Sequence, residues 1–76
     1  MSSFVRFVIK TYKKSDTPFG DVARDMIQDE SIMRHWSYRR FLLHINTCHN
    51  PSVRVIQLIE ELNDIYRHHQ QHLYHL

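Results

Sequence analysis

The sequence predicts an all-α fold, a compact bundle of four to five short helices that forms one domain over residues 1–76. Apolar residues recur at intervals of three and four in each long segment, the spacing that places them on one face of a helix. Residue types that favour helix starts precede these segments. With 42% apolar residues, 12% aromatic residues and one glycine, the composition is that of a folded chain.

The first predicted helix begins after Ser3, whose side chain can cap a helix N-terminus. Its apolar residues widen into one face: Phe4, Val5, Phe7, Val8 and Ile9. Such a β-branched run is also compatible with a strand. No partner strand appears elsewhere in the sequence, so we favour a helix.

The second helix is predicted over residues 18–28, because Thr17 and Pro18 form a cap-then-proline start. Its apolar residues again follow the three-and-four spacing: Phe19, Val22, Ala23, Met26 and Ile27. Gly20 lies in the first turn. It indicates either an irregular turn or the close approach of a neighbouring backbone.

The third helix is predicted from residue 38 to about residue 46, with Ser37 as its cap. Its inward-facing residues are expected to be Phe41, Leu42 and Ile45. In the connection before it, Ile32 and Met33 are expected to plug the core.

The longest predicted helix spans residue 51 to about residue 69 and forms the wall against which the others pack. We expect Asn50 to cap it and Pro51 to occupy its first position. Its apolar stripe comprises Val55, Ile56, Leu58, Ile59, Leu62, Ile65 and Tyr66. Residues 69–76 either continue this helix or form a frayed tail.

Several protein classes are excluded by the length and the apolar pattern. No apolar run approaches the roughly 20 residues that span a bilayer, and the start of the chain lacks the apolar stretch of a signal peptide. The lone Cys48 cannot form an internal disulfide, which agrees with a reducing compartment. We therefore expect a cytoplasmic protein with no membrane partner, and one too small for a deep substrate cleft.

The charges are unevenly distributed although the net charge is only +2. Residues 1–14 and 31–54 each carry four cations and no acid, whereas residues 15–30 carry five acids and one arginine. If the two basic segments lie side by side, they form a positive face for nucleic acid. The candidate residues are Arg6, Lys10, Lys13, Lys14, Arg34, Arg39 and Arg40. Alternatively, the acidic segment packs between the two and neutralises them.

The chain contains seven histidines, and His68, His72 and His75 follow one helical face. Two or three imidazoles at this spacing can reach one divalent ion. They lie in the last residues of the sequence without a carboxylate or thiolate nearby. We therefore expect weak binding to a nickel or zinc resin, but no physiological metal or other cofactor.

A thiolate activated by an imidazole is the one catalytic arrangement to consider, at His44, Cys48 and His49. No orienting acid is close to them in sequence. No paired carboxylates, glycine-rich phosphate loop or serine nucleophile motif occurs elsewhere. We expect no catalytic residue, no small-molecule substrate and no enzymatic activity.

A binding role is favoured by the mixture of cations and aromatics over residues 34–40. Such mixtures occur at protein interfaces and on nucleic-acid-binding surfaces. Trp36 is expected to be at least half buried where helices meet, which leaves the arginines on the surface. The prediction is a module for association with a protein partner or with itself, with non-specific nucleic-acid binding as the alternative.

The chain resembles the YozE family of small bacterial proteins of unknown function. The matching positions are dispersed over most of the sequence: Ser3, Phe4, Pro18, Gly20, Val22, Ala23, Asp29, Ile32 and Tyr66. The chain departs from the family's Phe-Pro at Ile32-Met33 and from its Tyr-Leu near Leu43 and His44. The resemblance implies a fold similar to a sterile alpha motif and a bacterial or phage origin. It carries no site residues, because such folds serve different functions.

Overall fold

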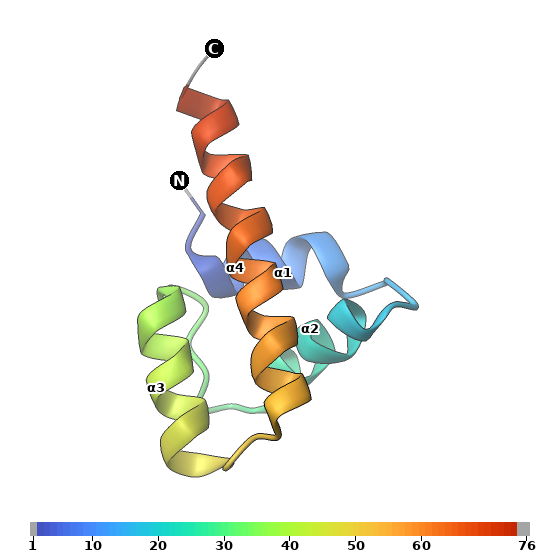
Figure 1. The fold of residues 1–76 in the computed structure, drawn as a ribbon, viewed down its shortest axis with the longest axis vertical. Helices are drawn as coiled ribbons and strands as arrows, with labels where there is room; N and C mark the ends of the chain where they lie inside the picture. The colour runs from blue at the N-terminus through green and yellow to red at the C-terminus, as the bar shows by residue number, and fades with distance from the viewer. Residues whose placement is uncertain (1, 75–76) are drawn as a thin grey trace.

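The computed structural model describes residues 2–74, with side chains up to Gln71, and it confirms the predicted all-α fold. Its helices are α1 (Phe4–Tyr12), α2 (Pro18–Gln28), α3 (Tyr38–Cys48) and α4 (Val53–Tyr74). Figure 1 shows α4 as a long spine, with α1 crossing behind its middle and with α2 and α3 beside its first half. The second half of α4 extends beyond the other three helices (Figure 1). Among the described residues, no helix has the length and hydropathy needed to cross a bilayer.

The core is centred on α1, whose apolar residues are all buried, as are Ile59 and Leu62 of α4. The ring of Phe4 has no exposed surface and makes edge-on contacts with Tyr38 and Tyr66, at centroid distances of 5.3 and 5.7 Å. Edge-on aromatic pairs add to the stabilisation from burial. The sequence assigned the organising role to the long helix, but α1 is the element most enclosed by the others.

Two of the predicted helix caps are confirmed. The hydroxyl oxygen of Ser3 accepts a hydrogen bond from the Arg6 backbone N–H, and that of Ser37 accepts one from the Arg40 N–H, both at 3.2 Å. Each bond satisfies one of the donors that a first helical turn leaves unpaired. Thr17 precedes α2 as predicted and has the same extended backbone as Ser3 and Ser37, but its side chain makes no capping bond to that helix.

The predicted start of the last helix was wrong by two residues. Asn50 has a φ of 43°, a left-handed conformation that asparagine tolerates, so it ends the turn after α3 instead of capping α4. The cap is Ser52, whose hydroxyl oxygen accepts from the Val55 N–H at 3.3 Å. The left-handed residue reverses the chain direction first, and the new helix then begins at Val53.

Of the two residues predicted to plug the core from the connection before α3, only one does so. Ile32 packs against the core, whereas Met33 is 48% exposed and does not plug it. Trp36, only 8% exposed, lies where the helices meet, as expected. At the other end of the chain, the helical alternative for residue 69 onward applies up to Tyr74, and residues 75 and 76 lie outside the described part.

Candidate functional site

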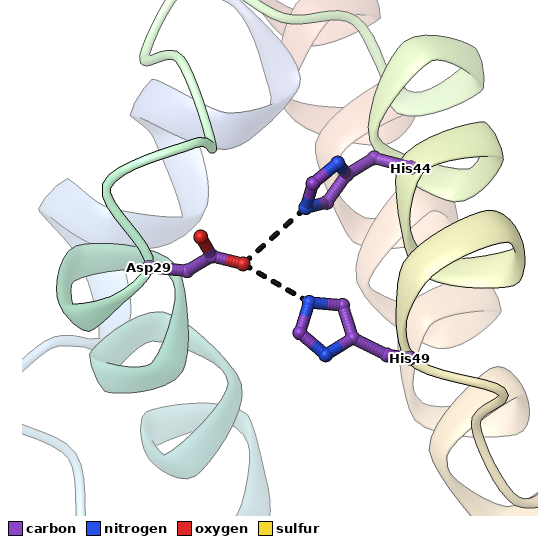
Figure 2. A group of neighbouring side chains, drawn as sticks. All are labelled: Asp29, His44 and His49. Carbon is purple, nitrogen blue, oxygen red and sulfur yellow. Dashed lines mark hydrogen bonds and ion pairs between the residues drawn. The ribbon is translucent and has the colours of Figure 1, made fainter.

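Three polar side chains converge where the ends of α2 and α3 meet. Asp29 is the residue that follows α2, His44 lies in α3, and His49 follows α3. Figure 2 shows both imidazoles directed at the same carboxylate oxygen. Oδ2 of Asp29 lies 3.3 Å from Nε2 of His44 and 3.0 Å from Nε2 of His49. We call these three residues the Asp29 cluster.

The carboxylate is oriented by the turn that follows it. The backbone N–H of Ser31 donates to Oδ1 of Asp29 at 3.0 Å, and the Ser31 hydroxyl donates to the same oxygen. These bonds, helped by His44 and His49, hold the pKa of Asp29 well below its ordinary value, although partial burial opposes the shift. Asp29 is therefore ionised at neutral pH, with Oδ1 engaged by Ser31 and Oδ2 directed at the histidines.

His44 is enclosed by aromatic and sulfur groups. Its side chain is only 9% exposed, and its ring centroid lies 5.2 Å from that of Trp36. The Arg40 guanidinium covers the Trp36 ring at 4.3 Å from its centroid. On the other side of the imidazole, Nδ1 lies 3.8 Å from Sγ of Cys48. The packing fixes the ring plane so that Nε2 points at Asp29.

Cys48, His44 and Asp29 thus form a line of the type seen in thiol catalysis, with the orienting acid that is distant in sequence. Cys48 is the last residue of α3 and lies one helical turn after His44. Its Sγ meets Nδ1 of His44, whereas Nε2 of the same ring faces Asp29. The imidazole is therefore held between the sulfur and the carboxylate.

An apolar groove of about 520 Å³ opens between α2, α3 and α4. Its apolar walls come from Val22, Met26, Ile32, Phe41, Val55 and Ile59. Asp25, Asp29 and His49 line its polar edge, so the Asp29 cluster and the groove are continuous. Among the residues that the structure describes, no lysine or arginine lines this groove.

All seven cations predicted for nucleic-acid binding are exposed. Within residues 2–74, none of them forms an ion pair, and Asp21 of the acidic segment pairs with Arg24 instead. The Ser3 hydroxyl donates to the Arg34 carbonyl, so Arg34 lies beside the start of α1. Lys13 and Lys14 follow the other end of that helix.

The predicted histidine stripe is only partly within the described side chains. His68 is exposed on α4, while the His72 side chain and all of His75 lie outside the described part. His69, the residue after His68, packs against Phe7 at a centroid distance of 5.0 Å.

The sequence interpretation missed the Asp29 cluster. Asp29 lies 15 and 20 positions from His44 and His49, so no local spacing joins them. One signal was present: His44 is three residues after the inward-facing Phe41, on the same face of α3.

Comparison with models of protein families, with curated proteins and with solved structures finds no match for this chain.

Proposed function

We propose that this protein is a non-enzymatic binding module that accepts an apolar segment of a partner protein, with a basic residue next to the apolar anchor. The observation that carries the proposal is the apolar groove with its acidic edge. Hydrophobic grooves of this kind accept the apolar face of a segment of a partner protein.

The groove offers both apolar area and a charge preference. Val55 of its wall is 36% exposed, and burial of such surface by a partner is favourable. Asp25 at the edge is exposed and has no ion-pair partner among residues 2–74. A lysine or arginine of the partner beside this carboxylate gives electrostatic complementarity, which favours a basic segment over an acidic one.

Selection from a phage-displayed library of random peptides tests the proposal, with EDTA present throughout. The groove variant is Val55→Arg, and the matched control is Val53→Arg on the same helix, because Val53 is 75% exposed and does not line the groove. We expect enriched peptides to combine apolar anchors with a basic residue. Their binding should be lost in Val55→Arg and kept in Val53→Arg.

Enrichment of acidic peptides, equal binding to both variants, or no enrichment at all would overturn the proposal. Analytical ultracentrifugation of the free protein covers the remaining outcome. A stable dimer that Val55→Arg disrupts would show that a second copy occupies the groove in place of a foreign partner.

Nucleic-acid binding is the second candidate. It is favoured by the seven exposed cations, none of which is ion-paired to another described residue. Fluorescence anisotropy of a labelled random-sequence DNA duplex tests it at low and at physiological salt. Binding through phosphates should weaken by about one power of salt concentration per contact. Replacing Lys10, Lys13 and Lys14 by glutamine should reduce it, while Val55→Arg should not. Absence of binding at low salt would remove this candidate.

Kinship with the YozE family and a cytoplasmic location stay predictions from the sequence. Binding of a partner protein, as proposed above, is compatible with both predictions.

A further inference from the structure

We propose that Asp29, His44 and His49 bind one divalent transition-metal ion of the zinc class. Their candidate ligand atoms all lie within 4.8 Å of one another. In a tetrahedral zinc site with bonds of about 2.0–2.1 Å, the ligand atoms are separated by about 3.3 Å. The separations of Asp29 Oδ2 from the two Nε2 atoms, 3.3 and 3.0 Å, already approach this value.

Two of the three ligands, Asp29 and His44, are held in place by groups outside the cluster. Ser31 engages Oδ1 of Asp29 through two hydrogen bonds, which leaves Oδ2 for an ion. When Nε2 of His44 binds a metal, its proton moves to Nδ1, and Sγ of Cys48 lies 3.8 Å from Nδ1 as an acceptor. Supporting contacts of this kind are typical of metal ligands and tune metal affinity.

The donor set selects the class of ion. Two imidazoles and one carboxylate suit zinc, cobalt, nickel, copper and iron, whereas calcium and magnesium prefer oxygen ligands. Three protein ligands leave a fourth tetrahedral position for water or another donor. Since Asp29 and His49 line the groove, the open position is accessible from it. This inference concerns ions alone and does not depend on the proposed binding of a peptide.

The test uses the full chain without an affinity tag, stripped of metal with EDTA and then dialysed. Calorimetric titration with zinc chloride should give one tight site per chain. Cobalt chloride should give the intense visible absorption of a tetrahedral complex. It should also quench the fluorescence of Trp36, the single tryptophan, because His44 lies against its ring. A hundredfold excess of zinc over Kd should raise Tm by about 10 °C or more.

Two variants and a control separate this site from the histidines of α4. His49→Gln removes a ligand whose side chain is 51% exposed, so the fold should survive, and Asp29→Asn removes the charge. Each should weaken zinc binding by about tenfold to a hundredfold or more. His68→Gln is the matched control, because it removes another exposed imidazole that lies outside the cluster, and it should leave the tight site unchanged.

Three outcomes would overturn the inference. The first is unchanged zinc affinity in both His49→Gln and Asp29→Asn, and the second is loss of the tight site in His68→Gln. The third is a folded wild-type protein that binds neither zinc nor cobalt, in which case the short distances are hydrogen bonds between imidazole N–H groups and a carboxylate. The peptide selection contains EDTA, so its result stands independently of this one.

Discussion

Gly20 lies directly against the backbone carbonyl of Ser15. A Cβ atom at position 20 would overlap that carbonyl oxygen, and the Arg24 guanidinium, 3.0 Å from the same point, closes the remaining space. The chain turns between α1 and α2 at this contact, so the glycine is required by a close approach between two backbone segments. Its φ is not positive, so backbone conformation is not the reason.

Gly20→Ala should therefore destabilise the protein, although alanine is the better helix former by about 1 kcal/mol. We expect the clash to outweigh that gain and to lower the free energy of unfolding by about 2–3 kcal/mol. Urea denaturation followed by far-ultraviolet circular dichroism measures the change. Thr11→Ala, at an exposed position in α1, is the control and should not reduce stability. A more stable Gly20→Ala variant would mean that the turn between these helices is adaptable.

The hydrogen bonds that lower the pKa of Asp29 predict a pH-dependent contribution to stability. Because the pKa is lower in the folded state than the ordinary 3.8, this contribution is fully present above about pH 4 to 5 and is lost as the pH falls further. In EDTA, wild type should be more stable than Asp29→Asn at pH 7, and the difference should shrink toward pH 3.

Urea unfolding at pH 7, 5, 4 and 3 measures this difference. Glu30→Gln, at the neighbouring exposed carboxylate, should keep the wild-type profile. A gap between wild type and Asp29→Asn that stays constant down to pH 3 would contradict the assigned role of the carboxylate.

The corrected start of α4 can be tested by exchanging its flanking residues. Ser52→Ala removes the hydroxyl that accepts from Val55 and should cost about 1 kcal/mol. Asn50→Gly should be neutral or nearly so, because glycine adopts a φ of 43° readily. Thermal unfolding should show a Tm lower by about 4–8 °C for Ser52→Ala only. A lower Tm for Asn50→Gly than for Ser52→Ala would show that Asn50 is the cap after all.

Tyr66 and Gln70 join the last helix to the residues before the first. The Tyr66 hydroxyl donates to the Ser2 carbonyl at 2.7 Å, and the Gln70 amide donates to the same carbonyl at 3.1 Å. Tyr66→Phe keeps the ring packing and should cost about 1 kcal/mol in unfolding free energy. Tyr12→Phe is the control, because the Tyr12 hydroxyl has no hydrogen-bond partner among the described residues. Equal stability of the two variants would show that the bond to Ser2 contributes nothing.

The sequence predicted the elements better than their contacts. Three of the four helix starts followed from a cap residue before an apolar period, because both signals are local. The prediction of Asn50 as a cap was wrong because asparagine also favours a left-handed turn. Which of the two roles it takes depends on the direction in which the chain must leave α3. Gly20 was recognised as unusual, but the identity of its neighbour required the fold.

The Asp29 cluster could not be predicted from local sequence spacing, for a related reason. Its residues come from two helix ends, and their distance depends on how α2 and α3 pack. The histidines of α4 were the metal-binding candidates in the sequence because they repeat along one helix. His44, whose position on the inward face of α3 indicated burial, gave the more informative signal.

The position of α1 has a consequence for synthesis of the chain. Its apolar face is made before α4, yet it shares the core with Ile59 and Leu62 and packs against Tyr66, which are made about 60 residues later. At about 5–20 residues per second, the ribosome needs about 3–12 seconds to add that length. Until then Phe4 can meet Tyr38 and Phe41 of α3, but Phe4 and Phe7 both lack their contact with Tyr66, so the hydrophobic core closes only after α4 has left the ribosome.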